Sequence, residues 1–123
     1  MTIWFFYCWA EIAGFSKFGS YVGNGSTDGP FIYTGFRPKF VMAKSSSAVA
    51  SWFILDTARN TYNAAGNSLY PNLSVAEDTG YYVIDALSNG FKLRSSYVNA
   101  NNNGDTYIYA AFAEVPTKFA LAR

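Results

Sequence analysis

"DTYIYAAFAE", residues 105–114, is the stretch that decides the fold. Successive side chains of a β-strand point to opposite faces, so this stretch divides into two sets. One set is Tyr107, Tyr109, Ala111 and Ala113, and the other is Ile108, Ala110, Phe112 and Glu114. A strand that is apolar on both faces belongs in the middle of a packed structure. We therefore predict a central strand here.

Working outward, short runs rich in aromatic or β-branched residues recur, each bounded by Gly, Asn, Ser, Asp or Pro. Such runs predict strands separated by turns, and no long stretch has the apolar spacing of a helix. The predicted strands lie near residues 3–12, 18–23, 30–34, 38–44, 50–56, 81–86, 90–95 and 105–114, with a ninth left open at 117–121. This spacing predicts an all-β fold, a single antiparallel β-sandwich or jelly-roll-like domain of eight or nine strands.

Alternation and turn residues refine this prediction. Trp52, Ile54 and Asp56 should share one face of their strand, with Phe53 and Leu55 on the other. "SNG" at residues 88–90 offers Asn89-Gly90, the best short hairpin signal of the chain. Residues 57–80 are the least strand-like part, and we expect a long ordered loop with at most a helical turn around 74–78.

Composition narrows the function classes. The chain has 123 residues, 50% of them apolar and 20% aromatic, which suffices for one core. A net charge of +1 with scattered basic residues gives no support for nucleic-acid binding. There is no histidine, the usual general base and the commonest metal ligand, and we expect no catalytic residues, metal or cofactor. The single cysteine, Cys8, cannot form an internal disulfide and should be a small buried residue.

The apolar beginning of the chain is not expected to insert in a membrane. Glu11 interrupts it, and it is shorter than the roughly 20 residues that a spanning helix needs. It also has no positively charged start and no convincing cleavage site of a secretory signal. We therefore expect synthesis in the cytoplasm and no membrane insertion.

The two ends of the chain resemble each other. At one fixed offset, "WFFYCWAE" (4–11) aligns with "YIYAAFAE" (107–114), and Lys17-Phe18 aligns with Lys118-Phe119 after a two-residue gap. We interpret residues 1–18 as the closing strand of a preceding repeat, or a linker, and residues 19–123 as the domain. Residues 3–12, the aromatic segment, would then pair at an edge of their own domain or join a neighbouring chain.

The body of the chain resembles a β-rich module that recurs in bacteriophage tail-fibre and other virion proteins. The resemblance covers residues 19–114 and rests on motifs in order, among them "YVGNGSTDGPFIYTGFRPKFVMAK", "SWFILDTARNTYN", "LYPN", "IDALSNGFKLR" and "TYIYAAFAE". It implies a virion location, on the phage tail or surface, and an attachment or structural role. It implies no chemistry.

Candidate ligand-binding residues lie in and around the long loop. Asp56, Arg59 and Asn60 could hydrogen-bond sugar hydroxyls, or else stabilise the loop through an Asp56–Arg59 ion pair and local bonds. Tyrosines in or beside loops suit stacking on sugars or filling a protein interface, or they pack under the loops. They are Tyr62, Tyr70, Tyr81, Tyr82 and Tyr97.

The candidate assembly residues lie in the aromatic segment. They are Trp4, Phe6, Trp9 and Glu11; Glu11 and Glu114 could instead be strand-end charges that blunt edge pairing, with Arg37 or Arg94 as partners.

Three functions remain open. The first is attachment of a virion to a host-surface glycan, with avidity from copy number. The second is a structural module that assembles with other virion proteins or as a homo-oligomer through its terminal strand. The third is a polysaccharide depolymerase, for which Asp56 and Asp85 are the candidates, although nothing in their spacing selects a carboxylate pair.

Overall fold

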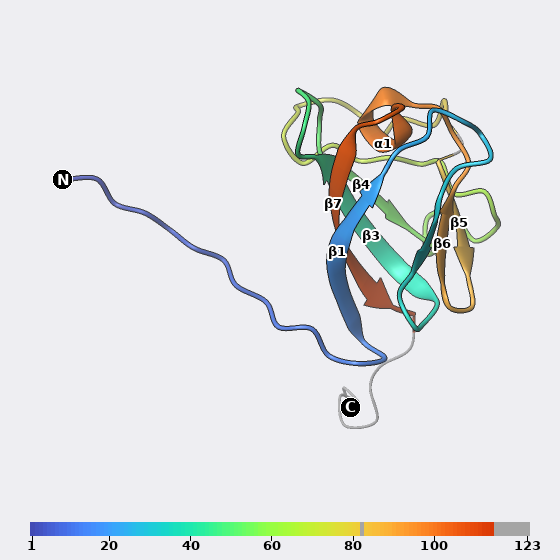
Figure 1. Ribbon diagram of the computed structural model, residues 1–123, viewed down its shortest axis with the longest axis horizontal. Coiled ribbons are helices and arrows are strands. Elements are labelled where there is room, and N and C mark those ends of the chain that lie inside the picture. The colour runs from blue at the N-terminus through green and yellow to red at the C-terminus, as the bar shows by residue number, and fades with distance from the viewer. Residues whose placement is uncertain (82, 115–123) are drawn as a thin grey trace.

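The computed structural model describes residues 1–81 and 83–114 and has an all-β architecture of two antiparallel sheets (Figure 1). The four-stranded sheet has the order β1-β7-β3-β4, and the three-stranded sheet has the order β2-β6-β5. The strands of the first are β1 (Ser16–Val22), β7 (Thr106–Ala113), β3 (Pro38–Ser45) and β4 (Phe53–Asp56). Those of the second are β2 (Phe31–Tyr33), β6 (Gly90–Leu93) and β5 (Ile84–Leu87). One helical turn, α1 (Val98–Asn101), precedes β7.

The strand predicted from "DTYIYAAFAE" is β7, and it lies in the interior of its sheet. It pairs with β1 on one side, where Ser16 faces Phe112, and with β3 on the other, where Val41 faces Ala111. Tyr107, Tyr109 and Ala111 share one face, as the alternation predicted, and this face is the buried one. The prediction of a central strand is therefore confirmed.

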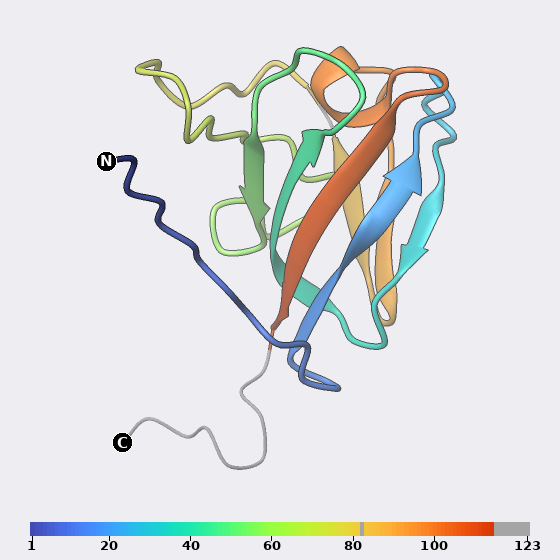
Figure 2. The ribbon, with the colours of Figure 1, turned by 60° about the vertical axis from the view of Figure 1, so that its left-hand side comes forward.

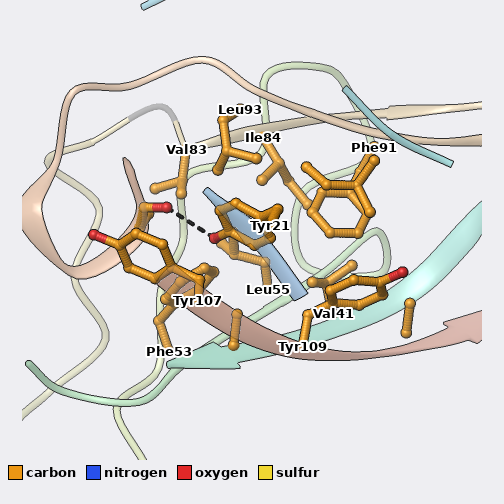
Figure 3. Close-up of a cluster of buried hydrophobic side chains, with 14 of the residues drawn as sticks. Tyr21, Val41, Phe53, Leu55, Val83, Ile84, Phe91, Leu93, Tyr107 and Tyr109 are labelled. Carbon is orange, nitrogen blue, oxygen red and sulfur yellow. Dashed lines mark hydrogen bonds between the residues drawn. The ribbon is translucent and has the colours of Figure 1, made fainter. Parts of the chain in front are cut away.

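The core lies between the two sheets. Figure 3 shows Val41, Leu55 and Tyr109 from one sheet facing Phe91 and Leu93 from the other. The Phe91 ring meets that of Tyr109 edge to face, at 5.4 Å between centroids. Phe53 and Leu55 point into this core, which confirms the predicted division of β4.

Tyrosine hydroxyls connect the core to α1. Tyr107, which is fully buried, donates its hydroxyl to the carbonyl of Val98 at 2.6 Å and accepts the amide of Asn102 at 2.9 Å. Tyr21 stacks on Tyr107 and donates to the carbonyl of Ala100 at 2.8 Å, the bond drawn in Figure 3. Burial, with a smaller contribution from Tyr107, raises the pKa of Tyr21, so its hydroxyl stays a donor.

The strand count corrects the prediction. Seven strands form within residues 1–81 and 83–114, rather than eight or nine. Residues 3–12 are not a strand: the chain is extended and exposed there, and only Ile12 makes an isolated bridge, to Ser16. Cys8 is exposed, not buried. The possible strand at 117–121 lies outside the described residues. β1 begins at Ser16, so the proposed boundary between residues 18 and 19 falls inside this strand.

The hairpin between β5 and β6 has a different loop from the one predicted. Leu87 pairs with Gly90, so the two-residue loop is Ser88-Asn89 and Gly90 belongs to β6. A side chain at Gly90 would put its Cβ 2.1 Å from the carbonyl oxygen of Ile32. Glycine is needed here because a neighbouring strand passes close to it, not because the turn needs a positive φ.

The long stretch at residues 57–80 has no helical turn at 74–78, and isolated bridges tie it to both sheets. Leu69 pairs with Ile54 on β4, and Ala65 pairs with Ile84 on β5. The loop therefore covers the outer edges of β4 and β5, which satisfies backbone groups that would otherwise be open to pairing.

Candidate functional site

Asp56, Arg59 and Asn60 are close together, and their polar atoms are largely occupied by the loop itself. Asp56 Oδ1 accepts the amides of Ala58 and Arg59, at 3.0 and 2.8 Å. Arg59 Nε donates to Asp56 Oδ2 at 2.5 Å, and the guanidinium also pairs with Glu77. Asn60 Oδ1 accepts the amides of two loop residues, Gly66 and Asn67. The arrangement matches the loop-stabilising alternative.

The electrostatics of this group hold Asp56 ionised. Partial burial alone would raise the pKa of Asp56, but the Arg59 amide and guanidinium, together with the Ala58 amide, lower it below its ordinary value. Burial alone would lower the pKa of Arg59, but its hydrogen bonds and ion pairs with Asp56 and Glu77 raise it. Asp56 is therefore an acceptor in a stable ion pair and not a group poised to exchange a proton.

Three tyrosines meet at a second place, which we call the tyrosine cluster: Tyr70, Tyr81 and Tyr97, with Asp78. The Tyr70 hydroxyl donates to Asp78 Oδ2 at 2.9 Å and lies 3.1 Å from the Tyr97 hydroxyl. The rings of Tyr81 and Tyr97 stack at 4.4 Å between centroids, and Tyr81 is 48% exposed. The cluster thus has an anchored polar side and an aromatic ring open to solvent.

Sequence reasoning proposed Tyr70 and Tyr97 but did not place Asp78 beside them. Burial, followed by the hydrogen bonds with Tyr97 and Asp78, raises the pKa of Tyr70, so this phenol remains neutral. Asp78 Oδ1 accepts the amide of Gly80, two residues further on, as aspartate often does in a turn. An Asp followed two residues later by Gly is the feature of the sequence that could have indicated this turn. Tyr62 is 85% exposed and belongs to no aromatic pair in the described part of the chain. Tyr82 lies outside the described residues.

The aromatic segment leaves the body at the start of β1 and diverges from the four-stranded sheet, so that the N-terminus lies apart from the body (Figures 1 and 2). Six of its large apolar side chains are 65–84% exposed: Ile3, Trp4, Phe5, Phe6, Tyr7 and Trp9. The candidates Trp4, Phe6 and Trp9 are therefore accessible.

Glu11 has a different role from its three neighbours. Its carboxylate accepts the Phe18 amide and the Lys17 ammonium, each at 3.1 Å. The Phe18 amide and then Lys17 lower the pKa of Glu11. The amide of Gly23 donates to Asp105 and that of Ala113 donates to Phe15, so by the strand register the odd-numbered residues of β1 form the hydrogen bonds with β7. The amide of the even-numbered Phe18 therefore points toward the free edge of the sheet. Glu11 caps this edge, as the strand-end interpretation expected. Its counterpart Glu114 pairs with Arg37 at 2.8 Å.

The face of the four-stranded sheet that points away from the core is largely apolar, although Ser20, Lys44 and Asp56 also lie on it; we call it the outer face. Its main apolar side chains are half-buried or exposed: Phe18, Phe40, Met42, Trp52, Ile108, Ala110 and Phe112. Phe112 lies at its centre, with the rings of Phe18 and Phe40 each 5.9 Å away between centroids.

Grooves separate the aromatic segment from the outer face. One of about 290 Å³ lies between Trp9 and residues that include Met42, Trp52 and Ile108. Another of about 540 Å³ is lined by Tyr7, Met42, Trp52, Pro71 and Asn72. The segment and the outer face are thus apolar surfaces that lie near each other and are incompletely filled.

The carboxylates that could serve catalysis are each paired. Asp56 and Glu77 bind Arg59, Asp78 accepts Tyr70, and Asp85 lies 3.3 Å from Arg94. Within residues 1–81 and 83–114 no group of three or more potential ligand residues is arranged to hold a metal ion. No helix in that part of the chain is long and apolar enough to cross a membrane.

These features define an all-β domain of two antiparallel sheets with an exposed aromatic N-terminal segment. Residues 4–116 match a family described as "Domain of unknown function (DUF7483)", and the chain belongs to this family. The matched range includes both copies of the repeated motif. No curated protein and no solved structure matches the chain.

Proposed function

We propose that the protein is a non-enzymatic structural module of a bacteriophage virion that assembles through its aromatic segment. The observation that carries the proposal is the exposure of six large apolar side chains in residues 3–9 beside an apolar sheet face. Monomeric soluble proteins rarely expose contiguous apolar patches larger than a few hundred Å², and larger ones mark interaction sites. The partners are copies of this chain or other virion proteins.

The virion location rests on the sequence resemblance described above. A β-sandwich of jelly-roll type is the fold that we propose for the two sheets, because their core lies between them. The absence of catalysis is supported by the pairing of each candidate carboxylate with a cation or a hydroxyl, since a glycosidase needs two carboxyl groups facing a substrate.

The test of this function is self-association. We expect the full chain to form oligomers, and removal of residues 1–12 or the triple change Trp4→Ser, Phe6→Ser and Trp9→Ser to leave a folded monomer. Light scattering measures the mass. The matched control is Val49→Ser with Tyr62→Ser, which also removes exposed apolar groups but lies outside the segment. A native mass that is unchanged by truncation would refute the role of the segment.

Attachment to a host-surface glycan is a second candidate, favoured by the tyrosine cluster. Tyr81 offers an open ring face held by Tyr97, and such platforms stack on sugar rings. A multimerised form of the protein should bind a component of a glycan array, and Tyr81→Ala should abolish that binding. Tyr62→Ala, at an exposed tyrosine outside the cluster, should leave it intact. Equal loss in both variants would remove the cluster from consideration.

A further inference from the structure

The aromatic segment repeats β7 face by face. At the fixed offset, the positions of Tyr107, Tyr109 and Ala111, which point into the core, are matched by Trp4, Phe6 and Cys8. Both series therefore run from two large aromatic residues to one small one. The outward positions of β7 are Ile108, Ala110 and Phe112, and the segment has Phe5, Tyr7 and Trp9 there. The Ala-Glu pair that follows is identical.

The environment of β7 explains why this pattern is specific. Ala111 is fully buried and lies between Lys17 of β1 and Val41 of β3, so a larger residue there would have to displace packed neighbours. The two larger positions, Tyr107 and Tyr109, pack in the core against the rings of Tyr21 and Phe91. Because β7 is paired on both sides, its outward residues Ile108, Ala110 and Phe112 lie between side chains of β1 and β3, among them Phe18, Phe40 and Met42.

We propose that residues 4–11 are the β7 strand of a second unit of this fold, lying between the β1 and β3 strands of that unit. The inference rests on the proposed assembly role and narrows it, since it names the partner as a unit that lacks a β7 strand of its own. Intact copies of this chain keep their own β7 between β1 and β3, so their self-association would use the exposed side chains of the segment without this insertion. Glu11 would lie where Glu114 lies here, beside the arginine that corresponds to Arg37. Cys8 would be buried at the position that corresponds to Ala111.

The geometry of the present chain is consistent with such a neighbour. The amide of Ala113 donates to the carbonyl of Phe15 at 2.7 Å, so the end of β7 and the start of β1 lie at the same end of the domain. A strand at 4–11 can therefore close one unit and pass through residues 12–15 into β1 of the next.

The first experiment transfers the segment into β7 of the full chain. The first in-frame variant places "WFFYCWAE" at residues 107–114. The second in-frame variant places only "FFYCW" at residues 108–112, so that Tyr107 keeps its hydrogen bonds. The control places "IWFFYCWA" (residues 3–10) at 107–114, which shifts the pattern by one residue and puts a tyrosine at position 111. We expect at least one in-frame variant to unfold cooperatively with a native β spectrum, and the control to lose both properties because the core is overpacked.

Equal behaviour of in-frame and shifted variants, or failure of both in-frame variants, would overturn the proposal. This outcome is independent of self-association, because the test needs no oligomer. The proposed function could fail by light scattering while the in-frame variants still fold.

The second experiment uses the single thiol of the chain as the reporter. Residues 15–106 are joined directly to residues 4–123, so the added unit lacks a β7 strand and is followed at once by the segment. We expect the reaction of Cys8 with a thiol reagent to slow by at least about 100-fold relative to the original chain, because a buried thiol reacts only through local opening. A control with Phe6→Asp should restore the fast reaction. A folded two-unit chain in which Cys8 reacts as fast as in the original chain would refute the insertion.

Discussion

Three core tyrosines form a graded test of how the fold uses their hydroxyl groups. Tyr107 makes two hydrogen bonds, to Val98 and from Asn102, while Tyr21 makes one, to Ala100. Tyr109 lies on the same strand face as Tyr107 and is 7% exposed, and its hydroxyl has no hydrogen bond among the described residues. Replacement by phenylalanine removes only the hydroxyl and leaves each ring in its contacts.

The expected costs follow from the number of groups left unpaired. Tyr107→Phe leaves one amide and one carbonyl without this partner and should lower the free energy of unfolding by about 2–3 kcal/mol. Tyr21→Phe loses one neutral bond and should cost about 1 kcal/mol. Tyr109→Phe should change the stability by less than about 0.5 kcal/mol. The predicted order is therefore 107, then 21, then 109.

Urea denaturation followed by far-UV circular dichroism measures these differences. The dependence of the free energy on urea should be unchanged in all three variants, because the surface exposed on unfolding is the same. An equal loss of unfolding free energy in Tyr107→Phe and Tyr109→Phe would refute the reasoning, because the hydrogen bonds of Tyr107 to the α1 region would then contribute nothing to stability. A greater cost at Tyr21 than at Tyr107 would equally contradict it.

Three further changes test other parts of the structure. Asn101→Ala should lower the free energy of unfolding in urea by about 2–4 kcal/mol, because the buried Asn101 side chain accepts the backbone amide of Asn24 and donates to the backbone carbonyl of Ser95. Asn24→Ala should lower it by less. Gly90→Ala should cost about 1–3 kcal/mol by the same assay, since the new methyl group would press on the carbonyl of Ile32, and a neutral result would mean that β2 lies further away. Asp56→Asn should cost about 1 kcal/mol at pH 7, as the loss of a comparable side-chain cap does. Since the pKa of Asp56 is lowered on folding, its contribution is complete above the ordinary value near 3.9 and disappears as the pH falls below it; thermal melts in which the difference between the two proteins persists at the lowest pH would contradict this.

The predictable part of this fold is the part that depends on neighbours in sequence. In β7 and β4 the alternation of side chains predicted which residues share a face, and the structure shows that the faces carrying Tyr107 and carrying Phe53 and Leu55 are the buried ones. Alternation is a property of the extended backbone itself, so it can be recognised before any partner strand is known. The loop-stabilising alternative for Asp56 and Arg59 was likewise available, because these residues are three apart.

The errors concern contacts between distant residues. Residues 3–12 have the composition of a strand, yet strand formation needs a partner, and within this chain β7 already occupies the place that their pattern suits. The Asn89-Gly90 pair suggested a turn, but the need for glycine comes from Ile32 of another strand.

The sequence by itself determined that this is a β-protein with a central strand at 105–114 and a motif repeated at residues 4–11. Strand propensity and alternation depend only on neighbouring residues, and a repeated motif can be recognised by comparing the sequence with itself. Only the tertiary structure decided that Tyr70, Asp78 and Tyr97 meet, that Glu11 caps the edge of β1, and that the aromatic segment lies outside the core. The physical reason is that hydrogen bonds and burial depend on which distant segments the chain brings together, and the order of the strands within each sheet sets those neighbours.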